Sequence, residues 1–196
     1  MIKYPGGVPY KKEEGTKKKK SSLQISISSA NRGMNLEEDI NISNEYYKEK
    51  GICLITKRPT PINIVKVDYT KGAKIIDAYF EHQSTTDYNG VYKGRYIDFE
   101  AKNTKSKTSF PLSNVTKHQI EHLKKVKEHG GIAFFIIQFE TLDLVFLVDS
   151  ELIIDQYESG SRKSITIETI KEKGKLVERA YYPRLKYIDA IEEMYF

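Results

Sequence analysis

Residues 84–102 read STTDYNGVYKGRYIDFEAK, and the last seven of them alternate in character. An apolar set and a charged set take turns along the chain, these being Ile97, Phe99 and Ala101 against Asp98, Glu100 and Lys102. Because successive side chains of a strand point to opposite faces, this pattern predicts a β-strand with one buried apolar face and one exposed charged face. A further acid, Asp87, lies thirteen residues before Glu100.

The charged face has the composition of a metal-dependent phosphodiesterase site. Glu100 and Lys102 leave one face of the strand about 6 to 7 Å apart, and a short hairpin could return Asp87 to them. One or two carboxylates suffice for Mg²⁺, which keeps several waters, and a lysine ammonium can offset charge that develops on a phosphodiester. The spacing alone leaves a second interpretation open, in which this is only the solvated face of an amphipathic strand.

Length and composition predict a single soluble domain. The chain has 196 residues, of which 39% are hydrophobic and 30% charged, enough to bury a core. The sequence contains no apolar run near the roughly 18 to 20 residues that span a bilayer, and the first twenty residues lack the apolar core of a signal peptide. We therefore expect a cytoplasmic location and no membrane partner. The single cysteine, Cys53, excludes an internal disulfide and is predicted to be a small core residue.

Positive charge is concentrated in two parts of the chain. Residues 1–30 hold seven lysines against two glutamates and few large apolar groups, so we expect a disordered tail. The other 166 residues balance at 25 basic and 25 acidic groups, but residues 57–107 hold ten basic and six acidic ones. Such a distribution suits a polyanionic partner, although a lysine-rich tail can also serve solubility alone.

The remaining periodicities predict an α/β fold with a mixed sheet. Helices are expected within 31–51, 115–131, 151–159 and 185–196, and strands within 52–59, 132–139 and 142–149. Residues 62–80 read as a hairpin around TKGAK, turns are indicated at Asn89-Gly90 and Lys93-Gly94, and 103–114 reads as a loop. The hairpin region has two open interpretations: its cations and aromatic rings contact nucleic acid, or it packs on the rest of the protein. The candidate nucleic-acid contacts are Lys57, Arg58, Lys66, Lys71, Lys74 and Phe80.

Asp87 followed by Glu100-Ala101-Lys102 resembles the PD-(D/E)xK nuclease signature of the restriction-endonuclease-like fold. The surrounding amino-acid sequence is also similar to that of the RecU Holliday junction resolvases of Gram-positive bacteria. The matching segments are NRGM.LE.D at 31–39, KRPTP at 57–61, the whole of 84–102, TSFPL at 108–112, HQIEH at 118–122 and GGIAFFII at 130–137. One departure is that Thr86 stands where the signature's name has proline.

The resemblance implies a role for particular residues. It assigns the metal to Thr85, Asp87, Glu100 and Gln119, and it makes Lys102 the lysine that stabilises the transition state. Arg32 would contact branched DNA, and residues 57–80 would form a stalk that enters the junction. The implied fold is a mixed sheet flanked by helices in a nuclease domain spanning 31–196. The implied cofactor is Mg²⁺, with Mn²⁺ able to substitute.

The implied function is cutting of four-way DNA junctions by paired nicks in recombination and repair. Implied partners are branched DNA, a second copy in a homodimer, a strand-exchange recombinase and a branch-migration helicase. A different class remains open, in which the protein binds junctions and regulates recombination without cutting. A third interpretation is a restriction-type enzyme that cuts linear duplex DNA.

Several of these residues have a structural interpretation as well. Thr116 and Gln119 have the spacing of a helix capping box, and Thr85 could only shape a turn. Asp98 is expected to pair with a nearby base. The resemblance implies that Glu37 or Glu38 on the first helix could be one more acid near the metal, but we expect a solvated helix face or favourable charge at its first turn. The four histidines lack zinc-site spacing and are predicted at the surface or on phosphates; they are His82, His118, His122 and His129.

Overall fold

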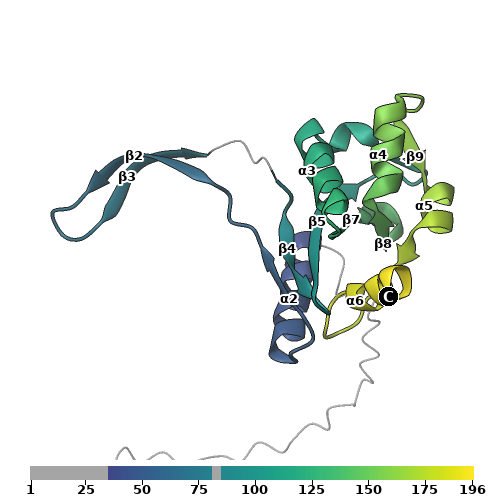
Figure 1. Ribbon diagram of the computed structural model, residues 1–196, viewed down its shortest axis with the longest axis horizontal. Coiled ribbons are helices and arrows are strands. Elements are labelled where there is room, and N and C mark those ends of the chain that lie inside the picture. The colour runs from purple at the N-terminus through teal and green to yellow at the C-terminus, as the bar shows by residue number, and fades with distance from the viewer. Residues whose placement is uncertain (1–34, 81–84) are drawn as a thin grey trace, which may run out of the picture. The chain divides into compact units, whose positions relative to one another are not determined.

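A six-stranded mixed sheet forms the centre of the computed structural model, which describes residues 35–80 and 85–196 (Figure 1). Its order is β1-β4-β5-β7-β8-β10, and only the β5–β7 pair is parallel. The strands are β1 (Leu54–Lys57), β4 (Tyr88–Tyr92), β5 (Arg95–Thr104), β7 (Ile132–Phe139), β8 (Leu144–Asp149) and β10 (Lys175–Leu176). The predicted tail at 1–30 lies outside the described residues.

Helices cover both faces of this sheet, as the sequence predicts. Those packed on one face are α2 (Leu36–Glu49) and α6 (Tyr187–Tyr195). Those on the other are α3 (Lys117–Glu128), α4 (Ser150–Ser159) and α5 (Ile167–Lys173). Each face has its own apolar core, and the mixed α/β architecture expected of the chain is confirmed.

The parallel β5–β7 pair is the part of the sheet that matters most for the site. All eight residues of β7 are buried, as a strand covered on both faces requires. Helix α3 connects the two strands and packs on them. On the opposite face, the Phe99 ring stacks between Tyr88 and Phe134 with centroids 4.8 Å apart on each side. These contacts fix β5 against both of its neighbours.

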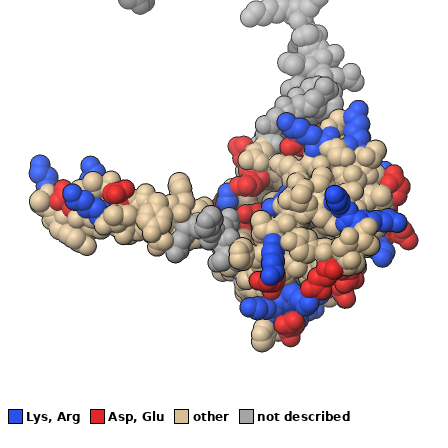
Figure 2. Space-filling model, turned by 90° about the horizontal axis from the view of Figure 1, so that it is seen from above, with Lys and Arg blue, Asp and Glu red and all other residues tan. Residues whose placement is uncertain are grey.

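The predicted hairpin exists, and its strands β2 (Ile62–Asp68) and β3 (Lys74–Phe80) pair only with each other. Its strands occupy the predicted residues 62–80. Lys57, which the resemblance places at the start of the stalk, instead ends β1 in the six-stranded sheet, so the hairpin is less basic than expected. Figure 2 shows charged side chains gathered near its turn and an uncharged surface along its length. The exposed apolar side chains there are Ile62, Ile64, Val65, Tyr69, Ile75, Ile76, Tyr79 and Phe80.

One of the two predicted turns is wrong. Lys93 and Gly94 do form the tight turn between β4 and β5, with φ of 46° and 76°. Gly90, by contrast, lies inside β4 opposite Ile55 of β1. A Cβ at Gly90 would overlap the carbonyl oxygen of Leu54, so this glycine permits the close approach of β1.

Other boundaries differ from the sequence prediction because tertiary pairing decides them. The first helix starts at Leu36, after the Asn35 N-cap. The loop predicted at 103–114 holds the end of β5, strand β6 (Ser109–Pro111) and a 3₁₀ turn, η1 (Leu112–Asn114). β6 pairs with β9 (Ser164–Thr166), and η2 (Glu140–Leu142) joins β7 to β8. Within the described ranges, no helix is both long and apolar enough to cross a bilayer.

Candidate active site

Asp87, Glu100 and Lys102 converge at one point of the sheet, as the spacing predicts. The backbone N–H of Asp87 donates to Glu100 Oε2 at 3.1 Å, and Asp87 Oδ2 accepts from the N–H of Ala101 at 3.1 Å. Lys102 Nζ lies 2.9 Å from Glu100 Oε1. The β4–β5 turn at Lys93-Gly94 produces this convergence, because it folds the start of β4 back alongside the middle of β5.

The charged face of β5 is buried, contrary to the prediction that it is exposed. Helix α3 covers it, and the Glu100 side chain is 3% exposed and that of Lys102 19%. Burial, and next the charge of Asp87, raise the pKa of Glu100 to about 8, while Lys102 lowers it. Two carboxylates are thus held together where solvation is poor, an arrangement that favours a cation between them.

The donor set of this site fits a hard divalent cation. Asp87 and Glu100 offer carboxylate oxygens, the ligand type that Mg²⁺ prefers. Among residues 35–80 and 85–196, no cluster of three or more His, Cys, Asp and Glu side chains has a metal-holding arrangement. Two carboxylates suffice for Mg²⁺, which keeps several waters when it binds to proteins.

Gln119 forms the predicted capping box and also contacts Glu100. Its amide oxygen accepts from the N–H of Thr116 at 3.0 Å, and its own N–H donates to Thr116 Oγ1 at 3.4 Å, which is a capping box. Its Nε2 also donates to Glu100 Oε1. With the amide oxygen committed to the cap, Gln119 holds the Glu100 carboxylate in place in this structure. Thr85 is half-buried two residues before Asp87, and direct ligation of metal by either residue stays a prediction.

Asp98 pairs with a base, as predicted, and its environment is more elaborate than the sequence indicates. The residue is fully buried, and Arg58 Nη2 donates to its Oδ2 at 2.6 Å. Tyr96 and His122 contact the same oxygen at 2.8 and 3.0 Å, and Thr86 Oγ1 donates to Oδ1. The prediction that His122 is a surface or phosphate contact is therefore wrong, since its ring belongs to this cluster.

The candidate DNA contacts fall into two groups, which are cations that form ion pairs within the protein and hairpin residues that are exposed or half-buried. Lys57 forms an ion pair with Glu37 of α2, so Glu37 is not merely a solvated acid. Arg58 is bound to Asp98. The hairpin residues are exposed or half-buried, and Phe80 is 77% exposed. Those that remain available to DNA are Lys66, Lys71, Lys74 and Phe80. Arg32 lies outside the described residues.

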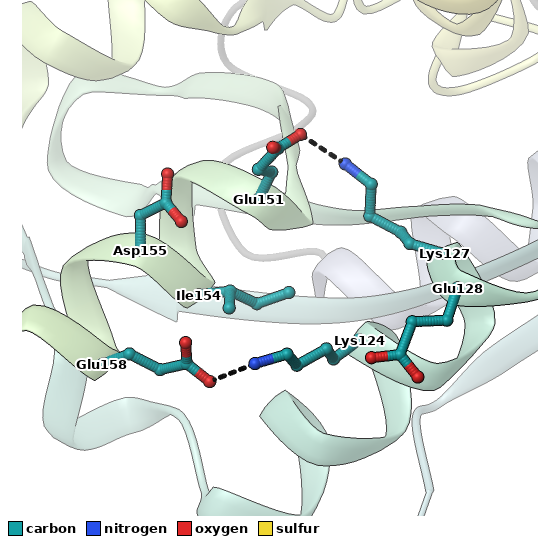
Figure 3. Close-up of a pocket in the computed structure, with 7 residues that line it drawn as sticks. All are labelled: Lys124, Lys127, Glu128, Glu151, Ile154, Asp155 and Glu158. Carbon is teal, nitrogen blue, oxygen red and sulfur yellow. Dashed lines mark hydrogen bonds and ion pairs between the residues drawn. The ribbon is translucent and has the colours of Figure 1, made fainter.

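The lysines on the far side of α3 are neutralised by acids of α4. A pocket of about 240 Å³ lies between these helices. Lys124 pairs there with Glu158 at 2.8 Å and Lys127 with Glu151 at 2.9 Å, the two contacts drawn dashed in Figure 3. Asp155 and Glu128 add negative charge to its rim. This acidic pocket is a poor surface for DNA.

Thr86, Tyr96 and His122 were missed as parts of the site. A signal for Tyr96 was present, because it continues the alternation of Asp98 and Glu100 along β5. His122 lies one helical turn after Gln119, which places both on one face of α3. Nothing in the sequence indicated that this face of α3 lies over this face of β5.

A mixed sheet in which Asp87 precedes one strand and Glu100 and Lys102 lie on the next is the arrangement that the resemblance to the PD-(D/E)xK nucleases implies. Residues 31–193 match the family model described as "RecU: Recombination protein U". The chain belongs to the RecU family.

Curated relatives match over the whole chain. A Holliday junction resolvase RecU of Geobacillus sp. (strain WCH70) is 51% identical, covering 100% of this chain and 98% of its own length. Proteins of the same name from Geobacillus thermodenitrificans (strain NG80-2) and Bacillus cereus (strain G9842) are 48% and 49% identical with the same coverage. A solved structure of Archaeoglobus fulgidus Hjc, a Holliday junction resolvase, matches 69% of this chain and 93% of its own, with 13% identity and a TM-score of 0.39.

Proposed function

We propose that this protein is a metal-dependent endonuclease that resolves four-way DNA junctions by paired nicks in recombination and repair. The observation that carries the proposal is the convergence of Asp87, Glu100 and Lys102 in a chain of the RecU family. A non-catalytic junction binder is not favoured, because the relatives at about half identity are named as resolvases. The place of action is the cytoplasm.

The cofactor in this proposal is Mg²⁺, with Mn²⁺ able to substitute, held by Asp87 and Glu100. When bound, such an ion lowers the pKa of a coordinated water and polarises the phosphodiester. Gln119 keeps the Glu100 carboxylate oriented toward Asp87. Lys102 carries its ammonium beside that carboxylate, where it compensates negative charge that grows on the phosphodiester oxygens during attack.

Recognition in this proposal depends on shape and backbone charge. A four-way junction has approximate two-fold symmetry and needs two matched nicks, which a C₂ homodimer with one site per subunit provides. Lysines near the hairpin turn contact phosphates. A strand-exchange recombinase and a branch-migration helicase are the proposed protein partners, on the family resemblance alone.

The test is cleavage of a four-way junction and of a linear duplex of the same sequence, each with Mg²⁺ and with EDTA. We expect symmetric nicks in the junction only, and none in EDTA. Equal cutting of both substrates would indicate a restriction-type enzyme. Tight junction binding with no cutting at any concentration of Mg²⁺ or Mn²⁺ would reject the nuclease proposal.

Neutralising the hairpin lysines should weaken DNA binding without affecting the fold. Lys71→Ala/Lys74→Ala removes two exposed charges near the turn, and each lost phosphate contact is expected to lower the salt slope by about 1. The measurement is junction affinity at several salt concentrations. The matched control is Lys124→Ala/Lys127→Ala, whose charges are already paired with α4. Equal slopes for the two double variants would contradict a DNA-binding role of the hairpin.

A further inference from the structure

Asp98 is the most heavily bonded acid of the site, yet the proposed chemistry does not use it. It is buried on the α3-facing side of β5, two residues before Glu100, and its two oxygens accept from four side chains. An ionised carboxylate is costly to bury unless it is paired and hydrogen-bonded. An arrangement with this cost calls for a structural or functional reason.

Two of the four partners lead directly to Asp87. Thr86, which donates to Asp98 Oδ1, is the residue before Asp87 and is fully buried. Arg58 donates to Oδ2 through its guanidinium, while its backbone N–H donates to the carbonyl oxygen of Asp87 at 2.7 Å. Asp98 is thereby linked to Asp87 in two ways. One link runs through Thr86, the preceding residue, and the other through Arg58, whose backbone N–H donates to the Asp87 carbonyl oxygen.

The other two partners lead away from the metal ligands. Tyr96 precedes Asp98 on the same face of β5, and its hydroxyl donates to Asp98 and accepts from Arg58. His122 comes from α3 and lies near a pocket of about 350 Å³ lined by Tyr96, Lys125 and His129. These two side chains reach Asp98 from positions that do not adjoin Asp87 in the chain, so they serve as references for Thr86 and Arg58.

An aspartate suits this position better than any neutral residue. An ionised carboxylate accepts only, with about four lone-pair sites on two oxygens, and here it meets four donors. An asparagine would turn an NH₂ group toward at least one of them. Thr86 occupies the place of the proline in the signature's name. Where a proline would fix the backbone before Asp87 through its ring, Thr86 can fix it through its hydroxyl.

We propose that Asp98 is a positioning residue, which holds Asp87 in its ligand geometry through Thr86 and Arg58. The inference rests on the proposed function only in taking Asp87 as a metal ligand. Groups that orient metal ligands typically contribute about 10- to 100-fold to metal affinity. Loss of the Thr86 link should therefore appear in metal binding itself, before any cleavage is measured.

The test compares three single substitutions in the full chain. Thr86→Val keeps the shape and removes the hydroxyl, Thr86→Ser keeps the hydroxyl, and Tyr96→Phe removes a different donor from the same carboxylate. Metal binding is measured by calorimetric titration with Mn²⁺ and by the shift in melting temperature with Mg²⁺. We expect Thr86→Val to weaken binding about 10- to 100-fold, and the other two to stay within about threefold of the wild type.

Junction binding in EDTA and amide hydrogen exchange of Asp87 complete the experiment. Thr86→Val should bind the junction as tightly as the wild type, and its Asp87 amide should exchange faster in the absence of metal. Equal metal affinity for Thr86→Val and Thr86→Ser, or an equal loss in Tyr96→Phe, would overturn the proposal. A loss of junction affinity with metal affinity intact would overturn it as well, because Asp98 would then act by presenting Arg58 and His122 to DNA.

The outcome does not depend on the proposed cleavage. If the wild type binds Mn²⁺ but cuts nothing, the proposed function fails and the effect of Thr86 on metal affinity is still measured. Asp98→Asn is unsuitable as the main variant, because it leaves a buried guanidinium without its counter-charge. If Thr86→Val does not fold, Arg58→Lys provides a second route. It keeps the backbone N–H to Asp87 but replaces the planar guanidinium on Asp98 with a flexible ammonium, so the same weakening of metal binding is expected, and wild-type affinity would count against the proposal.

Discussion

Lys102→Ala is expected to slow junction cleavage by about 10²- to 10³-fold, the usual cost of removing one preorganised group that stabilises a transition-state charge. The Lys102 ammonium lies 2.9 Å from Glu100 Oε1 and is mostly buried. After substitution by alanine, water cannot replace the positive charge that the ammonium supplies. Junction affinity should change little, because binding depends on many phosphate contacts and this is one lysine among 32 basic residues. The measurements are single-turnover cleavage and junction binding in EDTA.

Metal concentration needs attention in this experiment. Lys102 lowers the pKa of Glu100, so its removal also makes the carboxylate harder to ionise and weakens metal binding. Rates should therefore be compared at saturating Mg²⁺. Lys105→Ala is the matched control, since Lys105 lies three residues further along and is exposed. A Lys102→Ala protein that cuts at the wild-type rate, or that loses cutting only in proportion to junction affinity, would reject the catalytic role.

Asp87→Asn is expected to reduce cleavage by at least about 10³-fold, because several kcal/mol of transition-state stabilisation by a metal ion are lost with its ligand. The shape is preserved, and the remaining amide oxygen can still accept from the N–H of Ala101, as Asp87 Oδ2 does. The stabilisation that Mg²⁺ gives to the folded protein should vanish too, because a ligand raises the unfolding free energy only where it binds.

The same substitution should not destabilise the metal-free protein, which separates it from a damaged fold. Burial and the charge of Asp87 raise the pKa of Glu100 to about 8. An acid with a raised folded pKa contributes stability below its unfolded pKa and loses it as pH rises through the folded one. In EDTA the wild type should therefore lose stability between about pH 4.5 and pH 8, and Asp87→Asn should lose less.

Thermal unfolding with Mg²⁺ and with EDTA at pH 5, 7 and 9 checks both expectations. Asp155→Asn serves as the control, because this acid lines the α3–α4 pocket (Figure 3) and is not one of the proposed metal ligands. It should keep the Mg²⁺-induced shift of the wild type. An Asp87→Asn protein that melts lower in EDTA at every pH and still responds to Mg²⁺ would show that Asp87 is structural.

Local patterns predicted the parts of this protein that depend on neighbouring residues along the chain. The apolar run of β7 indicated a strand buried on both faces, and the alternation of 97–102 predicted which side chains share a face of β5, although not that both faces are covered. The Lys93-Gly94 signal predicted the turn that brings Asp87 to Glu100. Asn89-Gly90 carries a similar turn signal but lies within β4. A glycine can permit the close approach of a neighbouring strand as well as a turn, so the residue type alone does not separate the two.

The sequence by itself predicted the mixed α/β class from periodicity and the meeting of Asp87, Glu100 and Lys102 from short spacings, and its motifs resembled those of the family. Only the tertiary structure decided what covers the charged face of β5. Alternation shows that two faces differ, but which one is buried depends on α3, whose packing is set by contacts far apart in sequence. That packing raises the pKa of Glu100, gives Gln119 its second role, and places Arg58 and His122 on Asp98.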